Sequence, residues 1–286
     1  MLERSSKIFN MNRLGIKNQA QIIRCLVDGN SLRATTRITG VSRTTIIKLL
    51  ADVGKACSKY QDKALRNLPC KRIECDEIWS FCYSKQKNVP EKHQGKFGFG
   101  DVWTWTAICS DTKLIPSWFI GKRDADSATI FMKDLASRLA NRVQLTTDGL
   151  RAYVEAVEEA FGSEVDYEML VKIYGNDKDS VKRYGPAKCI GIKKEKINGN
   201  PVQRYTSTSY VERANLTLRM NNRRYTRLTN GFSKKIENLA HAVSLHFMYY
   251  NFCRIHQTLR VTPAMEAGVS DHVWEVEEIL ELLNKN

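Results

Sequence analysis

The clearest alternation of apolar and polar positions in this chain of 286 residues lies at 72–83 and predicts a β-strand with Asp76 near its middle. Weaker patterns predict further strands at 102–109, 113–120 and 143–148, and helices at 126–140 and 150–161. Three antiparallel strands followed by alternating helix and strand indicate an α/β fold, in which helices flank a mixed sheet.

Beyond residue 161 the predicted elements lie further apart. Residues 167–174 predict a fifth strand, and a long basic insertion near 175–205 separates it from a helix at 207–219. A loop of this length in a compact domain indicates a function. A helix at 232–251 and a helical tail at 271–286 follow, and the apolar stripe of the tail would pack on the main domain or on a second subunit.

The N-terminal part of the chain predicts three short helices between residues 19 and 53, with a glycine-containing turn between the second and the third. This is the helix-turn-helix arrangement, whose second helix enters the major groove of DNA. The side chains that would face DNA are Arg43, Thr44, Thr45 and Lys48. A scaffold or dimerisation role is the alternative. The expected organisation is a helix-turn-helix domain at 1–56, a linker at 57–70 that could be a helix leading into the first strand, an α/β domain at 71–270 and the tail at 271–286.

Three acidic residues stand where a metal site would need them: Asp76 within a strand, Asp148 at the end of a strand and Glu212 on a helix. Glu212, Asn215 and Arg219 share one helix face, because they are three and seven residues apart. Three carboxylates that meet require cations, and oxygen ligands suit Mg²⁺ or Mn²⁺. Two such ions can drive displacement at phosphorus. The alternative for any single acidic residue is a solvated surface charge.

The net charge of +14 is concentrated in one stretch. Residues 182–260 hold 16 Lys or Arg and only three acidic residues, and they surround Glu212. Such a field attracts a polyanion, so double-stranded DNA is the expected partner, with a merely solvated charged face as the alternative. The predicted DNA contacts in this stretch are Asn215, Arg219, Arg223, Arg224, Arg227, Lys234, Lys235 and His256, although His256 could instead make a structural hydrogen bond.

Five segments resemble the conserved blocks of transposases of the insertion-sequence-one family. They are Asp-Glu-Ile-Trp-Ser at 76–80, Thr-Asp-Gly at 147–149, Ser-Thr-Ser-Tyr-Val-Glu-Arg-Ala-Asn-Leu at 207–216, Arg-Tyr-Thr-Arg-Leu-Thr-Asn at 224–230 and Tyr-Asn-Phe-Cys-Arg-Ile-His-Gln-Thr-Leu at 250–259. The resemblance implies a ribonuclease-H-like domain with an Asp-Asp-Glu metal site, and Asp76, Asp148 and Glu212 match its three positions. Related proteins often carry an N-terminal zinc-binding module, whereas this sequence has no Cys-x-x-Cys pair.

The residues and the resemblance together predict a DNA transposase. It would hold two Mg²⁺ or Mn²⁺ ions per site, bind the ends of an insertion sequence as a homodimer or higher oligomer, release a 3′-hydroxyl and join it to target DNA. A structure-selective nuclease or resolvase and an inactive DNA-binding regulator are the alternatives. The eight cysteines lack paired spacing, and no signal peptide or long apolar stretch is visible, so reduced thiols, no membrane association and a cytoplasmic location in a prokaryote are expected.

Overall fold

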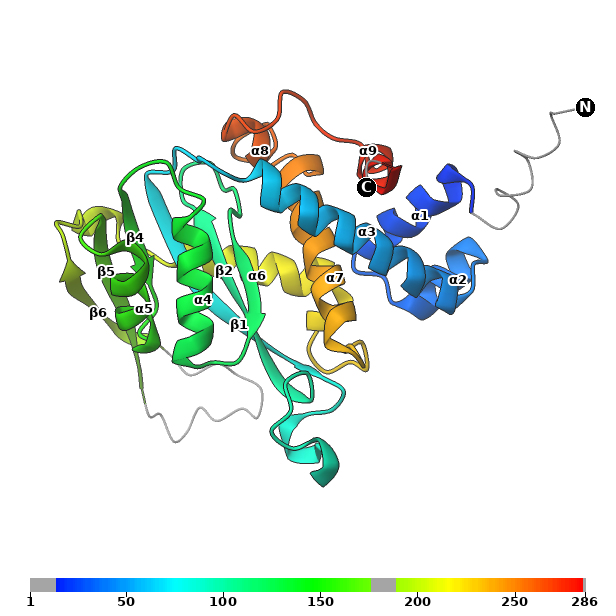
Figure 1. Ribbon diagram of the computed structural model, residues 1–286, viewed down its shortest axis with the longest axis horizontal. Coiled ribbons are helices and arrows are strands. Elements are labelled where there is room, and N and C mark those ends of the chain that lie inside the picture. Colours follow the sequence, from blue (N-terminus) through cyan, green and yellow to red (C-terminus); the bar gives the residue numbers. More distant parts are fainter. Residues whose placement is uncertain (1–13, 176–188, 285–286) are drawn as a thin grey trace, which may run out of the picture.

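A six-stranded mixed sheet forms the centre of the computed structural model, which describes residues 14–175 and 189–284 (Figure 1). Its strand order is β3-β2-β1-β4-β5-β6. The strands are β1 (Arg72–Cys82), β2 (Gly100–Cys109), β3 (Trp118–Gly121), β4 (Val143–Thr147), β5 (Val165–Tyr174) and β6 (Cys189–Asn198). β4 runs parallel to β1 and β5, and the other neighbours are antiparallel. The predicted α/β class with a mixed sheet is therefore confirmed.

Helices cover both faces of this sheet (Figure 1). The four that do so are α4 (Ala125–Ala136), α5 (Ala152–Phe161), α6 (Ser209–Asn221) and α7 (Ile236–Met248). Ile73 and Cys75 of β1 are buried with residues of α4 and α5, whereas Ile78 and Cys82 are buried with residues of α6 and α7. Successive side chains of a strand point to opposite faces, so one strand serves both layers. Within the described ranges, no helix is both long enough and apolar enough to cross a membrane.

The third strand is shorter than the sequence predicted. β3 begins at Trp118 and not at residue 113. Lys113 has a φ of 59°, which is the left-handed region, and Pro116 has no N–H to donate to a neighbouring strand. Residues 113–117 therefore turn between β2 and β3 before regular pairing resumes.

The predicted basic insertion contains a strand. β6 pairs antiparallel with β5 at the edge of the sheet, while residues 176–188 of the insertion lie outside the described ranges. Ile190 and Ile192 alternate with smaller or charged residues, but the surrounding lysines obscure this short pattern. Lysine-rich edge strands are common because the charge opposes pairing with other chains.

Three N-terminal helices precede the sheet: α1 (Ile16–Val27), α2 (Leu32–Thr39) and α3 (Arg43–Ala64). The side chains of Ser31 and Ser42 cap α2 and α3 by accepting hydrogen bonds from backbone N–H groups. α3 continues past residue 56, where the sequence predicted a linker, because Cys57 and Gln61 are buried. The expected boundary between residues 56 and 57 thus lies inside one helix.

α3 packs closely against α7 at Gly54. A Cβ atom added to Gly54 would lie 2.5 Å from the Cβ of His241, so only glycine permits this approach. The Ser244 hydroxyl donates a hydrogen bond to the Gly54 carbonyl at 2.9 Å, and the Gln61 amide donates to the Ser244 carbonyl at 3.1 Å. The N-terminal helices are therefore attached to the layer that also holds α6.

The C-terminal tail packs on the N-terminal helices of its own chain (Figure 1). Trp274 lies against the rings of Tyr60 and Phe252, at centroid distances of 5.0 and 5.2 Å. Arg24 of α1 forms an ion pair with Glu277 at 2.7 Å. The remaining helical elements here are a π-helical turn at Tyr249–Cys253, α8 (Pro263–Glu266) and α9 (Val276–Glu281). The apolar stripe of the tail is thus covered within the chain.

Candidate metal centre and adjoining basic cleft

Asp76, Glu77 and Asp148 form a carboxylate cluster, in which one oxygen atom of each residue lies within 4.8 Å of the others. Asp76 and Glu77 are consecutive on β1, and Asp148 directly follows the neighbouring parallel strand β4. The register pairs Cys75 with Thr147, which brings Asp148 beside Asp76. Three oxygen donors at this spacing could hold a metal ion.

Asp76 faces α6, where Asn215 orients it. The Asn215 amide nitrogen donates a hydrogen bond to Asp76 Oδ2 at 2.9 Å. Burial, reinforced by the charge of Asp148, raises the pKa of Asp76 to about 6. The Oδ1 atom of Asn215 is buried and has no hydrogen-bond partner among the described residues. The sequence predicted that Asn215 contacts DNA, but it is buried and holds a carboxylate of the cluster.

Glu77 is buried on the opposite face of β1, where two groups hold it. The Arg123 guanidinium donates to Glu77 Oε1 at 2.7 Å, and the Tyr153 hydroxyl donates to Oε2 at 3.1 Å. Arg123 also reaches Asp148, at 3.7 Å. Burial and the neighbouring carboxylates of Asp148 and Asp76 raise the pKa of Glu77, and burial raises the pKa of Asp148. The cluster therefore carries repulsion that a cation would relieve.

Glu212 lies close to this cluster but is paired with a lysine. It forms an ion pair with Lys172 of β5 and accepts a hydrogen bond from the Thr208 hydroxyl at 2.5 Å. Its charge contributes to the raised pKa values of Asp76 and Asp148. The structure thus brings two of the three predicted acids together, puts Glu77 beside them and leaves Glu212 facing Lys172.

A buried glutamate fixes the helix that carries Glu212 and Asn215. Glu74, two residues before Asp76 on β1, accepts hydrogen bonds from the backbone N–H groups of Tyr210 and Val211 at 2.8 and 3.1 Å. These groups belong to the first turn of α6, whose own N-cap residue makes no side-chain cap. Sequence reasoning missed Glu74, although its spacing from Asp76 places both on one face of β1.

A basic cleft of about 1330 Å³ lies between the end of β1, the end of α6 and the segment 223–234. No Asp or Glu lines it, and its cations form no ion pair with any carboxylate of the described residues. The cationic lining residues are Lys85, Lys87, Arg219, Arg223, Arg224, Arg227 and Lys234. Five of the predicted phosphate contacts are therefore gathered in one cleft, and Lys235 is exposed beside it.

The basic cleft combines closely spaced cations with a row of aromatic rings. Burial and the charge of Arg227 lower the pKa of Arg219, and burial lowers the pKa of Arg224 to about 10. Arg219 lies one turn of α6 beyond Asn215, which bonds to Asp76, so the cleft adjoins the carboxylate cluster. The rings of Trp79, Phe81 and Phe232 follow one another along the lining, at centroid distances of 5.8 and 4.7 Å. Cations interleaved with aromatic rings are typical of surfaces that bind nucleic acids.

The other predicted DNA contacts lie elsewhere. Arg43, Thr44, Thr45 and Lys48 are exposed on the first two turns of α3. His256 lines a separate cleft with Arg213 and Arg254, and its Nδ1 atom lies 3.2 Å from the Thr258 hydroxyl. The structure therefore does not bring these residues into the basic cleft.

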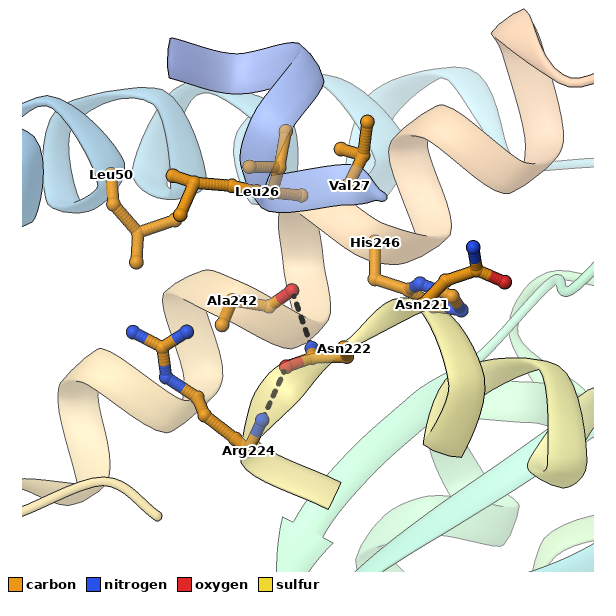
Figure 2. Close-up of a pocket in the computed structure, with 9 residues that line it drawn as sticks. Leu26, Val27, Leu50, Asn221, Asn222, Arg224, Ala242 and His246 are labelled. Carbon is orange, nitrogen blue, oxygen red and sulfur yellow. Dashed lines mark hydrogen bonds between the residues drawn. The ribbon is translucent and has the colours of Figure 1, made fainter. Parts of the chain in front are cut away.

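A third hollow, of about 10 Å³, lies where α1, α3, α7 and the end of α6 meet (Figure 2). It has room for no more than about one water molecule. The Asn222 amide spans the junction: it donates to the Ala242 carbonyl at 3.1 Å and accepts from the Arg224 N–H at 3.3 Å (Figure 2). Burial lowers the pKa of the adjacent His246 to about 3, so this imidazole is neutral. The hollow is a packing junction and not a ligand site.

Comparison with protein-family models gave no match, and neither did comparison with curated proteins.

Proposed function

We propose that the protein is a DNA transposase with a ribonuclease-H-like catalytic domain. One observation carries the proposal: a carboxylate cluster adjoins a large cleft that, among the described residues, is lined by seven cations and no acid. A polyanion would neutralise the cleft and at the same time bring its phosphodiester linkages to the cluster. The resemblance of the sequence to transposases of the insertion-sequence-one family agrees with this chemistry.

The donor atoms of the cluster fit Mg²⁺ or Mn²⁺. The ions would be held by Asp76 and Asp148, with Glu77 or Glu212 as a third carboxylate. The unpartnered Oδ1 atom of Asn215 is a further oxygen donor at this place. When bound, two such ions activate the attacking hydroxyl and stabilise the charge that develops at phosphorus.

The side chains around the cluster would position the DNA. Arginines of the cleft bind backbone phosphates, and Arg219 does so one turn of α6 beyond Asn215, which holds Asp76. The ring row of Trp79, Phe81 and Phe232 offers stacking surfaces for unpaired bases at an opened DNA end. Water first cleaves a phosphodiester and leaves a 3′-hydroxyl. That hydroxyl then attacks a phosphodiester of target DNA, so that one P–O bond forms as another breaks.

The N-terminal helices would hold the end of the element. We assign the helix-turn-helix role to α2 and α3, because Arg43 and Lys48 are exposed at the capped start of α3. Since two element ends must be cut and joined together, the working form is at least a homodimer on double-stranded DNA.

The proposal is tested with labelled DNA that carries the genomic flanks of the gene. The purified protein is incubated with this DNA and a target plasmid, with Mg²⁺ or with EDTA. We expect cleaved ends and joined products that require Mg²⁺. Cleaved ends without any joined product would support a nuclease or resolvase instead, and binding without cleavage would support a regulator.

A further inference from the structure

A second cleft, of about 320 Å³, lies on the other flank of α6. Tyr210, Arg213 and Thr217 line it and form one stripe along the helix, because they are three and four residues apart. Glu212 follows Tyr210 by two residues, which is roughly 200° around the helix. The same helix therefore presents Glu212 to Lys172, close to the carboxylate cluster, and this stripe to a separate cleft.

The second cleft is positively charged. Lys113 is only 8 % exposed there, and its ammonium lies 3.3 Å from the centre of the Tyr210 ring. Arg213, Arg254 and His256 line the same cleft, and none of its described lining residues is Asp or Glu. Within the described ranges, neither Lys113 nor either arginine forms an ion pair with a carboxylate. Burial, Lys113 and Arg254 lower the pKa of His256, which agrees with a surplus of positive charge.

The floor of this cleft is apolar. Ile108, Ala214 and Tyr250 are each at most 8 % exposed, and they lie beneath the cations. Tyr210 is 43 % exposed and adds a flat aromatic surface at the side. The volume is at the lower end of the range for small-molecule sites, about 300 to 1000 Å³. An apolar floor beneath these cations fits a ligand that combines a flat ring with a phosphate.

We propose that this cleft binds a nucleoside monophosphate, either free or as the 5′-phosphorylated end of a DNA strand. Arg213 and Arg254 would bind the phosphate oxygens, as guanidinium groups do in bidentate fashion, and Lys113 would add a point charge. The base would lie on the apolar floor beside Tyr210. The site is distinct from the carboxylate cluster and requires neither a metal ion nor strand transfer.

The test is a calorimetric titration of the full chain, without metal, by deoxyadenosine 5′-monophosphate. Deoxyadenosine and inorganic phosphate are titrated separately. The site variant is Arg213→Gln/Arg254→Gln, which changes two exposed side chains, and the control is Lys133→Gln/Lys193→Gln, which changes two exposed lysines that line neither cleft. We expect the nucleotide to bind at least tenfold tighter than either of its parts, the site variant to weaken it at least tenfold, and the control to leave it unchanged.

Three outcomes would overturn the proposal. They are no saturable nucleotide binding, inorganic phosphate binding as tightly as the nucleotide, and equal loss in the site variant and in the control. Competition by DNA with a 5′ overhang identifies the source of the ligand. If a 5′-phosphate end displaces the bound nucleotide more strongly than a 5′-hydroxyl end does, the cleft binds DNA ends. If both ends displace it equally, the cleft binds free nucleotide. Because cleavage is not measured, failure here is separable from failure of the transposase proposal.

Discussion

Replacing Lys172 with methionine is expected to tighten the binding of a divalent cation to the carboxylate cluster. Lys172 is paired with Glu212, and its charge also opposes the rise in the pKa of Asp148. An ammonium at this place competes with a metal ion for the same carboxylates. Methionine keeps an unbranched side chain of similar length but removes the charge. Glu212 then has no ion pair with residue 172 and can bind the metal ion.

The size of this effect follows from Coulomb's law. Two unit charges about 4 Å apart interact by about 1 kcal/mol in water and by about 4 kcal/mol at the effective dielectric near a protein surface. Lys172 is 29 % exposed and Glu212 is 42 % exposed, so solvent screening favours the lower part of this range. For a divalent ion we therefore expect a gain of about 1 to 3 kcal/mol, which is a roughly 5- to 150-fold tighter dissociation constant.

The assay is a titration with Mn²⁺ in the absence of DNA, in which electron paramagnetic resonance measures the free ion. Lys193→Met is the matched control: Lys193 lies on the adjacent strand β6 and pairs with Glu195 at 2.8 Å, outside the cluster. Unchanged or weaker Mn²⁺ binding in Lys172→Met would refute the reasoning. Equal tightening in Lys193→Met would also refute it, because the effect would then reflect net charge alone.

Three further predictions concern packing, pH and salt. Gly54→Ala would place its Cβ 2.5 Å from that of His241. The overpacking costs about 3 kcal/mol and the higher helix propensity of alanine returns about 1 kcal/mol. We therefore expect urea unfolding to show that the free energy of unfolding falls by about 2 kcal/mol. His246 is neutral when folded, with a pKa of about 3, but takes up a proton when unfolded below pH about 6.5. Stability should therefore fall as the pH falls, and the wild type should lose about 2 kcal/mol more than His246→Gln between pH 7 and 5. The double variant Arg223→Gln/Arg227→Gln should reduce the slope of log affinity against log salt by about 2 in DNA-binding anisotropy.

Each of these predictions has a control. Gly15→Ala meets no atom of the described residues within 4 Å and should leave stability almost unchanged, so an equal loss there would contradict the packing argument. Equal pH dependence in the wild type and in His246→Gln would contradict a neutral buried imidazole. For the salt dependence the control is Lys133→Gln, because Lys133 of α4 pairs with Glu159 of α5. This variant should change the slope of log affinity against log salt far less than Arg223→Gln/Arg227→Gln does.

The positions of Asp76 and Asp148 could be predicted because local pattern determines them. Both acids lie on or directly after strands with clear β-branched or alternating sequence, and parallel pairing brings them together. Glu77 could not be assigned in this way, since alternation places it on the opposite face of β1 from Asp76. Its role depends on Arg123, which approaches from the segment after β3. The pairing of Glu212 with Lys172 likewise depends on how β5 lies beside α6.

Contacts between distant parts of the chain also explain where the observed elements differ from the predicted ones or extend them. α3 continues through the expected linker because Cys57 is buried and Gln61 bonds to Ser244, more than 180 residues away in sequence. β6 was not predicted, because its lysine-rich sequence is typical of a solvated loop. Its strand conformation depends on pairing with β5. Local pattern is weak wherever a long-range partner decides the conformation.

We propose that the carboxylate cluster beside the basic cleft cuts and joins DNA. The most direct measurement compares the wild type with Asp148→Asn in a Mg²⁺-dependent joining assay, with DNA affinity measured in parallel. We predict that the variant binds DNA as the wild type does and forms joined product only at background level. Joined product at the wild-type rate in Asp148→Asn would contradict the claim.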